Sequence, residues 1–405
     1  METRFDAVIV GAGPAGASAA IWLAQAGWRV ALIEKQTFPR RKVCGECIAA
    51  SNLPLLETLG VGAAFAALAG PKLRDVALMH GSHSVVAKLP PVKGGMSRWG
   101  RALGRETLDT LLVAQARLTG VQVMQPWALQ RFEGGPGKWL CEVRAVETRT
   151  VLTLRAAVVI DAHGSWEPLP AQRMQQSCGV SDMLAFKANF SGASLPAGLL
   201  PVLSFAGGYG GMVMADQGLL TLACCVRRDR LAALRLKSPG LSAGAAVEAL
   251  LKRECAGVAA ALHSATRIGP WLASGPLAPG IRLRAEDPIF RIGNAAAEAH
   301  PIIGEGMSMA LQSAWLLSTH LVGTGDSPAL LDQGRQRAVS KRYARDWHRQ
   351  FAGRLRLASA LAHLAMRPDL ASPLLTLIRI WPGLLSLGAR WGGKTRFINT
   401  NRSAP

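Results

Sequence analysis

A glycine-rich turn close to the N-terminus constrains the fold of this chain more than any other feature. The apolar run Ala7–Val10 predicts a buried parallel strand, and a helix is expected over Pro14–Ala26. Between them, Gly11 permits a tight turn, Gly13 lets a pyrophosphate approach the backbone, and Gly16 lets the helix pack closely on the strand. The free N–H groups and the positive dipole end of that helix would face the phosphates.

A second strand and an acidic residue complete this unit. The run Val30–Ile33 predicts the strand, and Glu34 follows it where a carboxylate can accept hydrogen bonds from an adenosine ribose. Strand, turn, helix, strand and acid therefore occur in the order of a dinucleotide-binding unit. The alternative is a glycine-rich turn in another kind of α/β unit.

Length and composition indicate an ordered protein of two or three domains. The chain has 405 residues, of which 49% are hydrophobic and 18% charged, and this balance excludes general disorder. No secretory signal precedes the first strand, and no uncharged apolar stretch is long enough to span a bilayer. Seven scattered cysteines favour reduced thiols, and no Cys/His set has zinc spacing. We therefore expect a cytoplasmic protein without a metal site.

The net charge of +20 is concentrated near the C-terminus. Residues 331–405 contain fourteen Lys and Arg but three Asp and Glu, and these charges alternate with Leu, Ile and Trp. That pattern argues against nucleic acid as the partner. It favours peripheral contact with an anionic membrane surface or with an acidic carrier protein. The alternative is an ordinary C-terminal helical cap whose arginines face water.

Further periodic segments follow the dinucleotide-binding unit. Helical spacing is found at 53–59, 105–119 and 307–322, and strand-like runs at 73–88, 139–146, 151–162, 187–226 and 289–293. The pattern indicates an α/β protein with a strand-rich insertion.

Four segments together resemble a known superfamily. They are Gly11–Gly16, Arg105–Asp109, Val158–Ser165 and the pair Arg291–Ala296 with Pro301–Met307. The chain resembles the FAD-dependent superfamily of p-hydroxybenzoate hydroxylase, the flavin-dependent halogenases and the geranylgeranyl reductases, over about residues 1–325. Its motifs are most similar to those of the geranylgeranyl reductase-like flavoproteins.

The resemblance implies a Rossmann-like FAD-binding domain, an inserted antiparallel-sheet substrate domain and a C-terminal helical tail. The FAD-binding domain is expected at 1–72, 99–170 and 276–330, the substrate domain at 73–98 and 171–275, and the basic helical region at 331–405.

The resemblance also implies which residues hold FAD. The glycine turn would bind the pyrophosphate, Glu34 the ribose, and the N–H groups of Gly306 and Met307 the pyrimidine end of the isoalloxazine. The full set of expected cofactor-binding residues is Gly11, Gly13, Pro14, Ala15, Gly16, Glu34, Lys35, Arg41, Cys44, Arg105, Asp161, Gly164, Asn294, Pro301, Gly304, Gly306 and Met307.

Two departures from the superfamily pattern bear on the affinity for FAD and on the electron donor, respectively. Asn294 replaces an aspartate, and the turn after Asp161 lacks the arginine that serves FAD and NAD(P)H in the hydroxylases. No second glycine fingerprint follows a strand. Electrons are therefore expected from a transiently docking NAD(P)H, from a separate reductase or from the substrate itself.

Three residues are candidates for catalysis. Cys44 lies in a Lys-x-Cys-Gly loop like that of the geranylgeranyl reductases, where the cysteine is near the flavin. His300 precedes the isoalloxazine segment and could donate a proton. Tyr209 matches a reductase motif in which Gly211 and Val213 replace larger residues, so the substrate pocket should differ in shape. Cys44 could instead be only a small loop residue.

The resemblance implies an FAD-dependent oxidoreductase or monooxygenase. Its substrate would be a lipophilic small molecule or a carrier-bound chain of polyketide, prenyl or acyl type, attacked by hydride transfer or by flavin hydroperoxide chemistry. One alternative is a flavin-dependent halogenase, although no catalytic lysine aligns and Lys72 is only a nearby candidate. Another is a non-enzymatic FAD-binding protein that docks through its basic tail.

Overall fold

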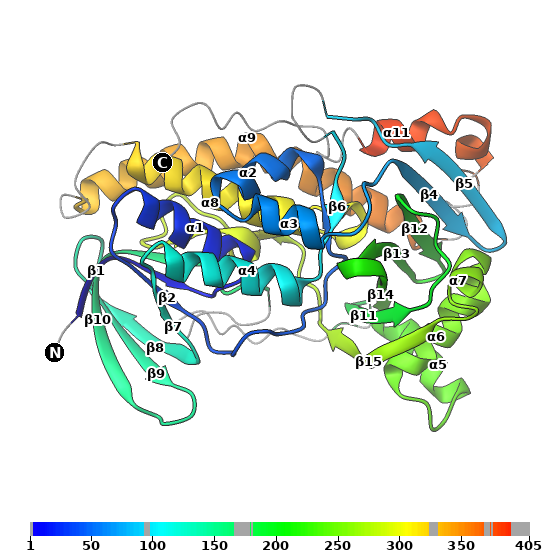
Figure 1. The fold of residues 1–405 in the computed structure, drawn as a ribbon, viewed down its shortest axis with the longest axis horizontal. Helices are drawn as coiled ribbons and strands as arrows, with labels where there is room; N and C mark the ends of the chain where they lie inside the picture. Colours follow the sequence, from blue (N-terminus) through cyan, green and yellow to red (C-terminus); the bar gives the residue numbers. More distant parts are fainter. Residues whose placement is uncertain are drawn as a thin grey trace.

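Two sheets organise the molecule, and each lies in its own half (Figure 1). The computed structural model describes residues 3–92, 98–165, 179, 181–323, 331–367, 373 and 376–389. Within these residues both sheets have seven strands, and smaller two-stranded pairs join β3 (Cys47–Ile48) to β6 (Arg101–Ala102) and β16 (Gly280–Ile281) to β18 (Ala297–Glu298).

The first sheet carries the glycine turn. Its parallel part has the order β7–β2–β1–β10, and strands β9 and β8 continue it antiparallel beyond β10. The apolar runs predicted for β1 and β10 are buried, as expected for parallel strands covered on both faces. The strands are β1 (Thr3–Val10), β2 (Val30–Ile33), β7 (Gln122–Met124), β8 (Trp127–Glu133), β9 (Trp139–Ala145), β10 (Val151–Asp161) and β17 (Phe290–Arg291), which pairs with the end of β10.

Helices pack on the first sheet and on one another. α1 contacts α4 and α8, and Trp22 of α1 meets Trp315 of α8 edge to face, with ring centroids 5.0 Å apart. These helices share one apolar core with the sheet. The helices of this half are α1 (Pro14–Gln25), α2 (Leu53–Thr58), α3 (Gly62–Leu68), α4 (Arg105–Leu118), α8 (Gly306–Val322) and α9 (Gln333–Ala365).

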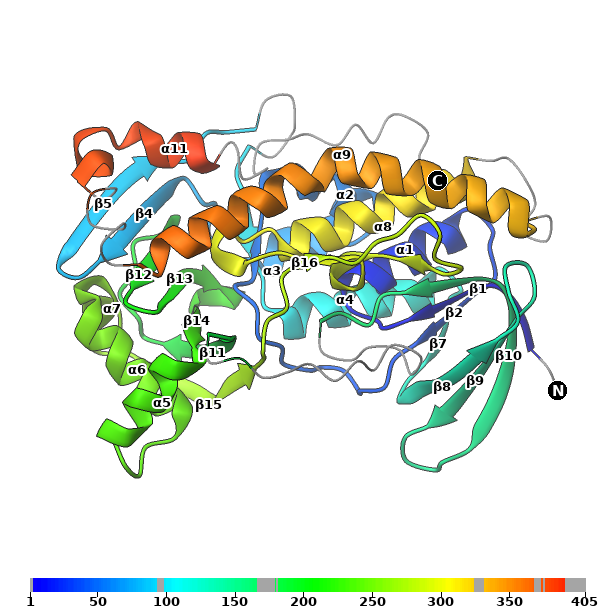
Figure 2. The ribbon, with the colours of Figure 1, turned by 180° about the vertical axis from the view of Figure 1, so that it is seen from behind.

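Helix α9 extends along the molecule from the first half to the second (Figure 2). Gln336 near its start donates to the Ala157 carbonyl of β10 at 2.9 Å, and its Ala365 carbonyl accepts from Ser204 of β12 at 2.9 Å. Its buried side chains recur every three or four residues, including Val339, Tyr343, Trp347, Phe351 and Leu355. Helix α9, the first part of the basic helical region, is therefore packed on the protein, as the helical-cap alternative expects.

The second sheet has the order β15–β11–β14–β13–β12–β4–β5. Adjacent strands in this sheet are antiparallel, except that β12 and β4 pair in parallel. The strands are β4 (Asp75–His80), β5 (His83–Lys88), β11 (Met183–Ser191), β12 (Leu199–Phe205), β13 (Gly208–Ala215), β14 (Leu219–Arg227) and β15 (Thr266–Ser274).

Three helices that the sequence analysis did not predict cover one face of this sheet. They are α5 (Arg228–Lys237), α6 (Ala243–Glu254) and α7 (Ala256–Ala261). A signal for α6 exists, since Ser242 caps its N-terminus and Val247, Leu250 and Leu251 are buried at helical spacing.

The predicted fold class is confirmed: an α/β protein with a Rossmann-like half, a sheet-rich second half and a C-terminal helical region. The last described helix, α11 (Gly383–Ala389), packs on β4 and β5. Across the described ranges, every helix is too short or too polar to cross a membrane.

Candidate active site

The glycine turn between β1 and α1 is a narrow backbone corner. Gly11 has φ +100°, and a Cβ added there would lie 2.5 Å from the carbonyl oxygen of Ala162. A Cβ at Gly16 would lie 1.9 Å from the Gly11 carbonyl oxygen. At Gly13 the nearest atom would be the Arg105 Nη2, at 3.5 Å. Two of the glycines are therefore required for packing, whereas the third leaves space beside the helix N-terminus.

Two guanidinium groups border this space. The nitrogens of Arg105 and Arg40 lie 3.5 and 3.9 Å from the position of a Gly13 Cβ. Arg105 pairs with the buried Asp109 at 2.7 Å, and Arg40 pairs with Glu34 at 3.2 Å. The two guanidinium groups, each fixed by a carboxylate, and the N-terminus of α1 surround the space beside Gly13. This arrangement of positive groups fits the pyrophosphate of FAD.

The Glu34 carboxylate forms hydrogen bonds within the protein that stabilise the glycine turn. Its Oε2 accepts from the Ala12 N–H at 3.0 Å, and its Oε1 accepts from the Gln36 N–H at 2.9 Å. The carboxylate thereby ties the glycine turn to the end of β2. Its predicted contact with the ribose stays a prediction.

Arg40, and not the predicted Arg41, borders the space beside Gly13. Arg41 instead reaches the second sheet, where it donates to Asn189 Oδ1 at 2.9 Å. Lys35 lies in an exposed position after β2. Neighbouring basic residues cannot be ranked from the sequence, because the loop conformation decides which of them faces Gly13.

Asp161 ends β10 beside the glycine turn and is fully buried. Its Oδ1 accepts from the His163 N–H at 3.3 Å, whereas its Oδ2 has no hydrogen-bond partner among the described residues. Gly164 follows at φ +92° with open space around it, and Asn294 donates to Ser165 at 2.7 Å. A buried carboxylate oxygen without a partner fits a ligand that brings a hydroxyl or N–H donor.

The segment expected along the isoalloxazine forms a sharp turn into α8. Residues Pro301–Ile303 make one turn of 3₁₀ helix, and Gly304 follows in the left-handed region at φ +63°. α8 begins at Gly306, where an added Cβ would meet no atom within 4 Å, and Met307 is buried. The helix N-terminus therefore opens onto free space, as the pyrimidine end of a flavin requires.

Glu305, at the N-terminus of α8, is fully buried, although the sequence position of an acid at a helix start is usually exposed. Its Oε2 accepts from Arg354 Nη1 of α9 at 3.4 Å, and the same nitrogen donates to Gln312 at 3.3 Å. The helical-cap alternative places the tail arginines in water, but Arg354 is buried and compensates the carboxylate at the start of α8.

Two of the three candidate catalytic residues lie together. The Tyr209 hydroxyl is 3.1 Å from His300 Nδ1, and the rings of His300 and His363 lie 5.8 Å apart. Burial lowers the pKa of His300 to about 4, and His363 acts in the same direction. Burial also raises the pKa of Tyr209, next to Cys225. Both members of the pair are therefore neutral near pH 7.

The third candidate, Cys44, lies in the loop that faces this pair. Its Sγ accepts from the Glu46 N–H at 3.3 Å, and the preceding Val43 packs against the cluster that contains Tyr209. Burial raises the pKa of the Cys44 thiol, although nearby Arg105 opposes the shift. The thiol is therefore protonated near pH 7, so a polar or steric role suits it better than that of a thiolate nucleophile.

A buried acid joins this loop to both halves of the protein. Glu46 is 1% exposed and has φ +59°, an unusual conformation for a residue with a side chain. Its carboxylate accepts from the Arg105 N–H at 2.9 Å, from Thr221 at 2.6 Å and from Lys187. The sequence analysis missed this cluster. A lysine inside the apolar strand 183–190 was the available signal.

The second sheet presents Lys187 and three smaller apolar residues in one row toward the same region. Lys187, Ala223, Gly211 and Val202 lie side by side across four strands. The last three are partly exposed, although strands flank them and helices cover the opposite face. Tyr209 belongs to the neighbouring row on the same face. These partly exposed apolar residues therefore lie on the face of the sheet that also carries Lys187 and Tyr209.

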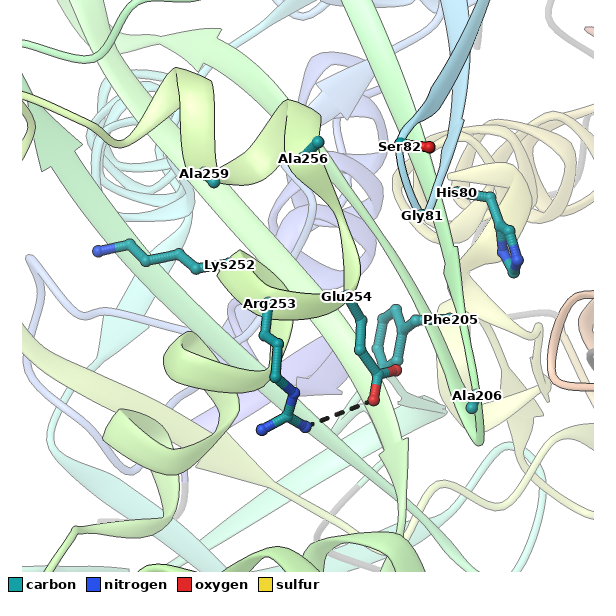
Figure 3. Close-up of a pocket in the computed structure, with 10 residues that line it drawn as sticks. All are labelled: His80, Gly81, Ser82, Phe205, Ala206, Lys252, Arg253, Glu254, Ala256 and Ala259. Carbon is teal, nitrogen blue, oxygen red and sulfur yellow. Dashed lines mark hydrogen bonds and ion pairs between the residues drawn. The ribbon is translucent and has the colours of Figure 1, made fainter.

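An open depression lies elsewhere on the described surface. It has a volume of about 560 Å³ between the β4–β5 turn and α6–α7, and none of the predicted site residues lines it (Figure 3). Its lining includes His80, Phe205, Lys252 and Glu254. Over the described ranges, no three His, Cys, Asp or Glu side chains form a group that could hold a metal ion.

Comparison with protein families decides the cofactor class. The model described as FAD binding domain matches residues 4–345. The chain belongs to this FAD-binding family. Conditioned medium factor receptor 1 of Dictyostelium discoideum is 25% identical over 374 residues, which are 86% of this chain and 68% of that protein. A menaquinone reductase of Mycolicibacterium smegmatis is 32% identical over 124 residues, which are 31% of this chain and 29% of that enzyme.

Solved structures with the same fold include a halogenase and a reductase-like protein. The myxobacterial chondrochloren halogenase CndH has a TM-score of 0.72 at 20% identity and covers 96% of this chain and 91% of its own. A geranylgeranyl bacteriochlorophyll reductase-like protein of Thermoplasma acidophilum has a TM-score of 0.65 at 15% identity and covers 96% and 100%. The expectation of an FAD-dependent flavoenzyme of the oxidoreductase or monooxygenase class is confirmed, and the roles of individual residues stay predictions.

The glycine geometry predicts opposite outcomes for two substitutions. Gly13→Val should fold, because its backbone (φ −69°, ψ −178°) suits valine, but should purify colourless because the side chain fills the phosphate space. Gly16→Ala should unfold or aggregate, because its Cβ would overlap the Gly11 carbonyl. Thermal unfolding and flavin absorbance check both; stoichiometric FAD in Gly13→Val would contradict the assignment.

The buried pair predicts a strong non-additive effect on stability. Glu46→Gln should lower the free energy of unfolding by about 3 kcal/mol, because it leaves the Lys187 ammonium buried without a counter-charge. The double variant Glu46→Gln/Lys187→Met should recover most of that loss. Glu133→Gln, in an exposed pair with Arg131, should change stability by less than about 0.5 kcal/mol. Urea unfolding of all variants measures the coupling, and additive losses would exclude it.

Burial of neutral His300 predicts acid sensitivity. Its pKa falls from 6.5 to about 4 on folding, so between these pH values the unfolded chain binds more protons than the folded one. The contribution of neutral His300 to the free energy of unfolding should therefore be fully present above pH 6.5. It should decrease by up to about 3 kcal/mol as the pH falls toward 4. His300→Gln should show a shallower decrease in urea unfolding over this range; an equal slope would show that His300 is not the responsible group.

Proposed function

We propose that this flavoenzyme oxidises, reduces or oxygenates a lipophilic substrate, either a free small molecule or a carrier-bound chain of polyketide, prenyl or acyl type. The observation that supports this most is the row Ala223, Gly211 and Val202, whose partly exposed apolar residues lie on the same face of the sheet as Tyr209. An aliphatic or aromatic group can pack against such a surface without leaving polar atoms unpaired. A small hydrophilic substrate would find few partners there.

The residues divide into those that bind the cofactor and those that face the substrate. Arg40, Arg105 and the N-terminus of α1 would hold the FAD pyrophosphate, and the N-terminus of α8 would stabilise negative charge on the reduced ring. FAD, when bound, supplies the hydride or the activated oxygen. Neutral Tyr209 and His300 can pass a proton along their hydrogen bond without either group carrying a charge at rest.

Relatives support the lipophilic character of the substrate. Menaquinone reductases, by their name, act on a lipophilic quinone, and the M. smegmatis enzyme is similar to this chain over 31% of its length. A chlorinase of Pseudomonas fluorescens acts, by its name, on a carrier-bound pyrrole and is 44% identical over 57 residues, 14% of this chain and 12% of that enzyme. For electrons we propose NAD(P)H, docking transiently or through a separate reductase.

Halogenation is the second candidate, because several of the similar solved structures are halogenases or brominases. Lys72, the nearby candidate for a halogenase lysine, lies exposed on the surface. The buried Lys187 is engaged by Glu46. Oxygen or hydride transfer therefore fits the described side chains better than halide chemistry.

Turnover of defined probes tests the proposal. Purified protein with FAD, NADPH or NADH, oxygen and chloride is incubated with a short-chain menaquinone or with an acyl-carrier thioester, and products are analysed by mass spectrometry. We expect a gain of one oxygen or a transfer of two hydrogens. Incorporation of chlorine into a probe would show that the protein is a halogenase instead. If the flavin is reduced by NADPH or NADH but both probes are recovered unchanged, the proposal of a lipophilic substrate is contradicted.

Cys44→Ser separates catalysis from cofactor binding in the same assay. The variant should retain FAD, because the guanidinium groups beside Gly13 remain. Its turnover rate, or the ratio of its products, should change by about tenfold or more. Cys141→Ala removes a buried thiol from the first sheet and serves as the matched control. Equal turnover of Cys44→Ser and the parent protein would assign the cysteine a merely structural role.

A further inference from the structure

The last described segment presents large apolar side chains to solvent. Residues 376–380 are helical, and Trp381 follows them immediately. Leu377, Ile380 and Trp381 stand at positions i, i+3 and i+4, on one side of the segment, and are 42%, 65% and 64% exposed. We refer to these three side chains as the tail face. Leu387 of α11 is also exposed.

The protein holds this segment from its other side. Ile378 is buried, Ser386 donates to the Lys88 carbonyl of β5 at 2.6 Å, and α11 packs on β4 and β5 (Figure 2). The tail face therefore points outward because the opposite side is anchored. By contrast, the apolar residues of α9, such as Leu355 and Phe351, are buried against the first half. Of the apolar side chains in the tail, those of the tail face are therefore exposed to solvent, whereas those of α9 are covered by the protein.

Positive charge surrounds the tail face in the sequence. Arg379 is exposed between its members, and Arg367 is exposed at the end of α9. The sequence after Ala389 contains Arg390, Lys394, Arg396 and Arg402 and no acidic residue. The whole chain carries a net charge of +20. Its partner should therefore offer an apolar layer and negative charge together.

We propose that the tail face inserts into the interface of an anionic lipid bilayer, so that the protein lies on the membrane without spanning it. Trp concentrates at the boundary between headgroups and acyl chains, and the flanking Leu and Ile side chains reach the apolar layer. Nearby Lys and Arg residues bind the anionic headgroups. An acidic protein surface would satisfy the charges but would leave the projecting apolar side chains in contact with polar groups.

Vesicle co-sedimentation of the full-length holoprotein tests this proposal. The protein is mixed at low salt with vesicles of phosphatidylcholine alone or of phosphatidylcholine with phosphatidylglycerol. We expect binding to the anionic vesicles, and its reversal at high salt. The variant Leu377→Ser/Ile380→Ser/Trp381→Ser should bind at least about tenfold more weakly. Leu118→Ser/Leu236→Ser, which alters two more exposed leucines (82% and 84%) outside the tail, should bind like the parent.

Several results would overturn the proposal. Equal binding of the triple variant and the parent protein would show that charge alone attracts the chain. Absence of binding to anionic vesicles at low salt, with binding to an acidic carrier protein, would assign the tail face to a protein partner. Loss of a dimer in the triple variant, without lipid binding, would assign it to a second copy. FAD content and turnover of a water-soluble probe should be unchanged in the triple variant, so the result stands apart from the substrate proposal.

Discussion

The carboxylate of Glu46 is the constraint on which the site depends. It lies where the loop from the first half meets α4 and the second sheet, and it accepts from Arg105, Lys187 and Thr221. A buried carboxylate is costly unless several donors compensate it. Because its donors come from three separate elements, the charge is stable only when all three are correctly placed. The ion pair therefore favours this one arrangement of the halves, because any other would leave a buried charge uncompensated.

Two functional groups follow from that arrangement. On the side of the first half, the loop that contains Glu46 sets Cys44 beside Arg105, whose guanidinium borders the phosphate space at Gly13. On the side of the second sheet, the same placement brings Tyr209 within 3.1 Å of His300. The proposed substrate space lies between these groups. The residues proposed to bind the cofactor and those proposed to face the substrate are thus joined through one buried charge.

The local parts of this design are readable from the sequence, and the long-range parts are not. Gly11 and Gly16 belong to one turn, so their close approach follows from spacing alone. Glu46 and Lys187 are 141 residues apart, and Tyr209 and His300 are 91 apart, so no periodicity links them. Their contacts depend on how two sheets pack, which is set by the summed shapes of many side chains. The helices α5–α7 were missed although the cap of α6 was visible.

Helix α9 has a mechanical consequence. It is hydrogen-bonded to β10 of the first sheet near its start and to β12 of the second sheet at its end, and it also compensates Glu305. A rigid rod fastened to both halves resists hinge opening between them. Access to the space between the halves must then come from movements of loops. The two halves should therefore keep a fixed relative position during turnover, and substrate entry should not require domain closure.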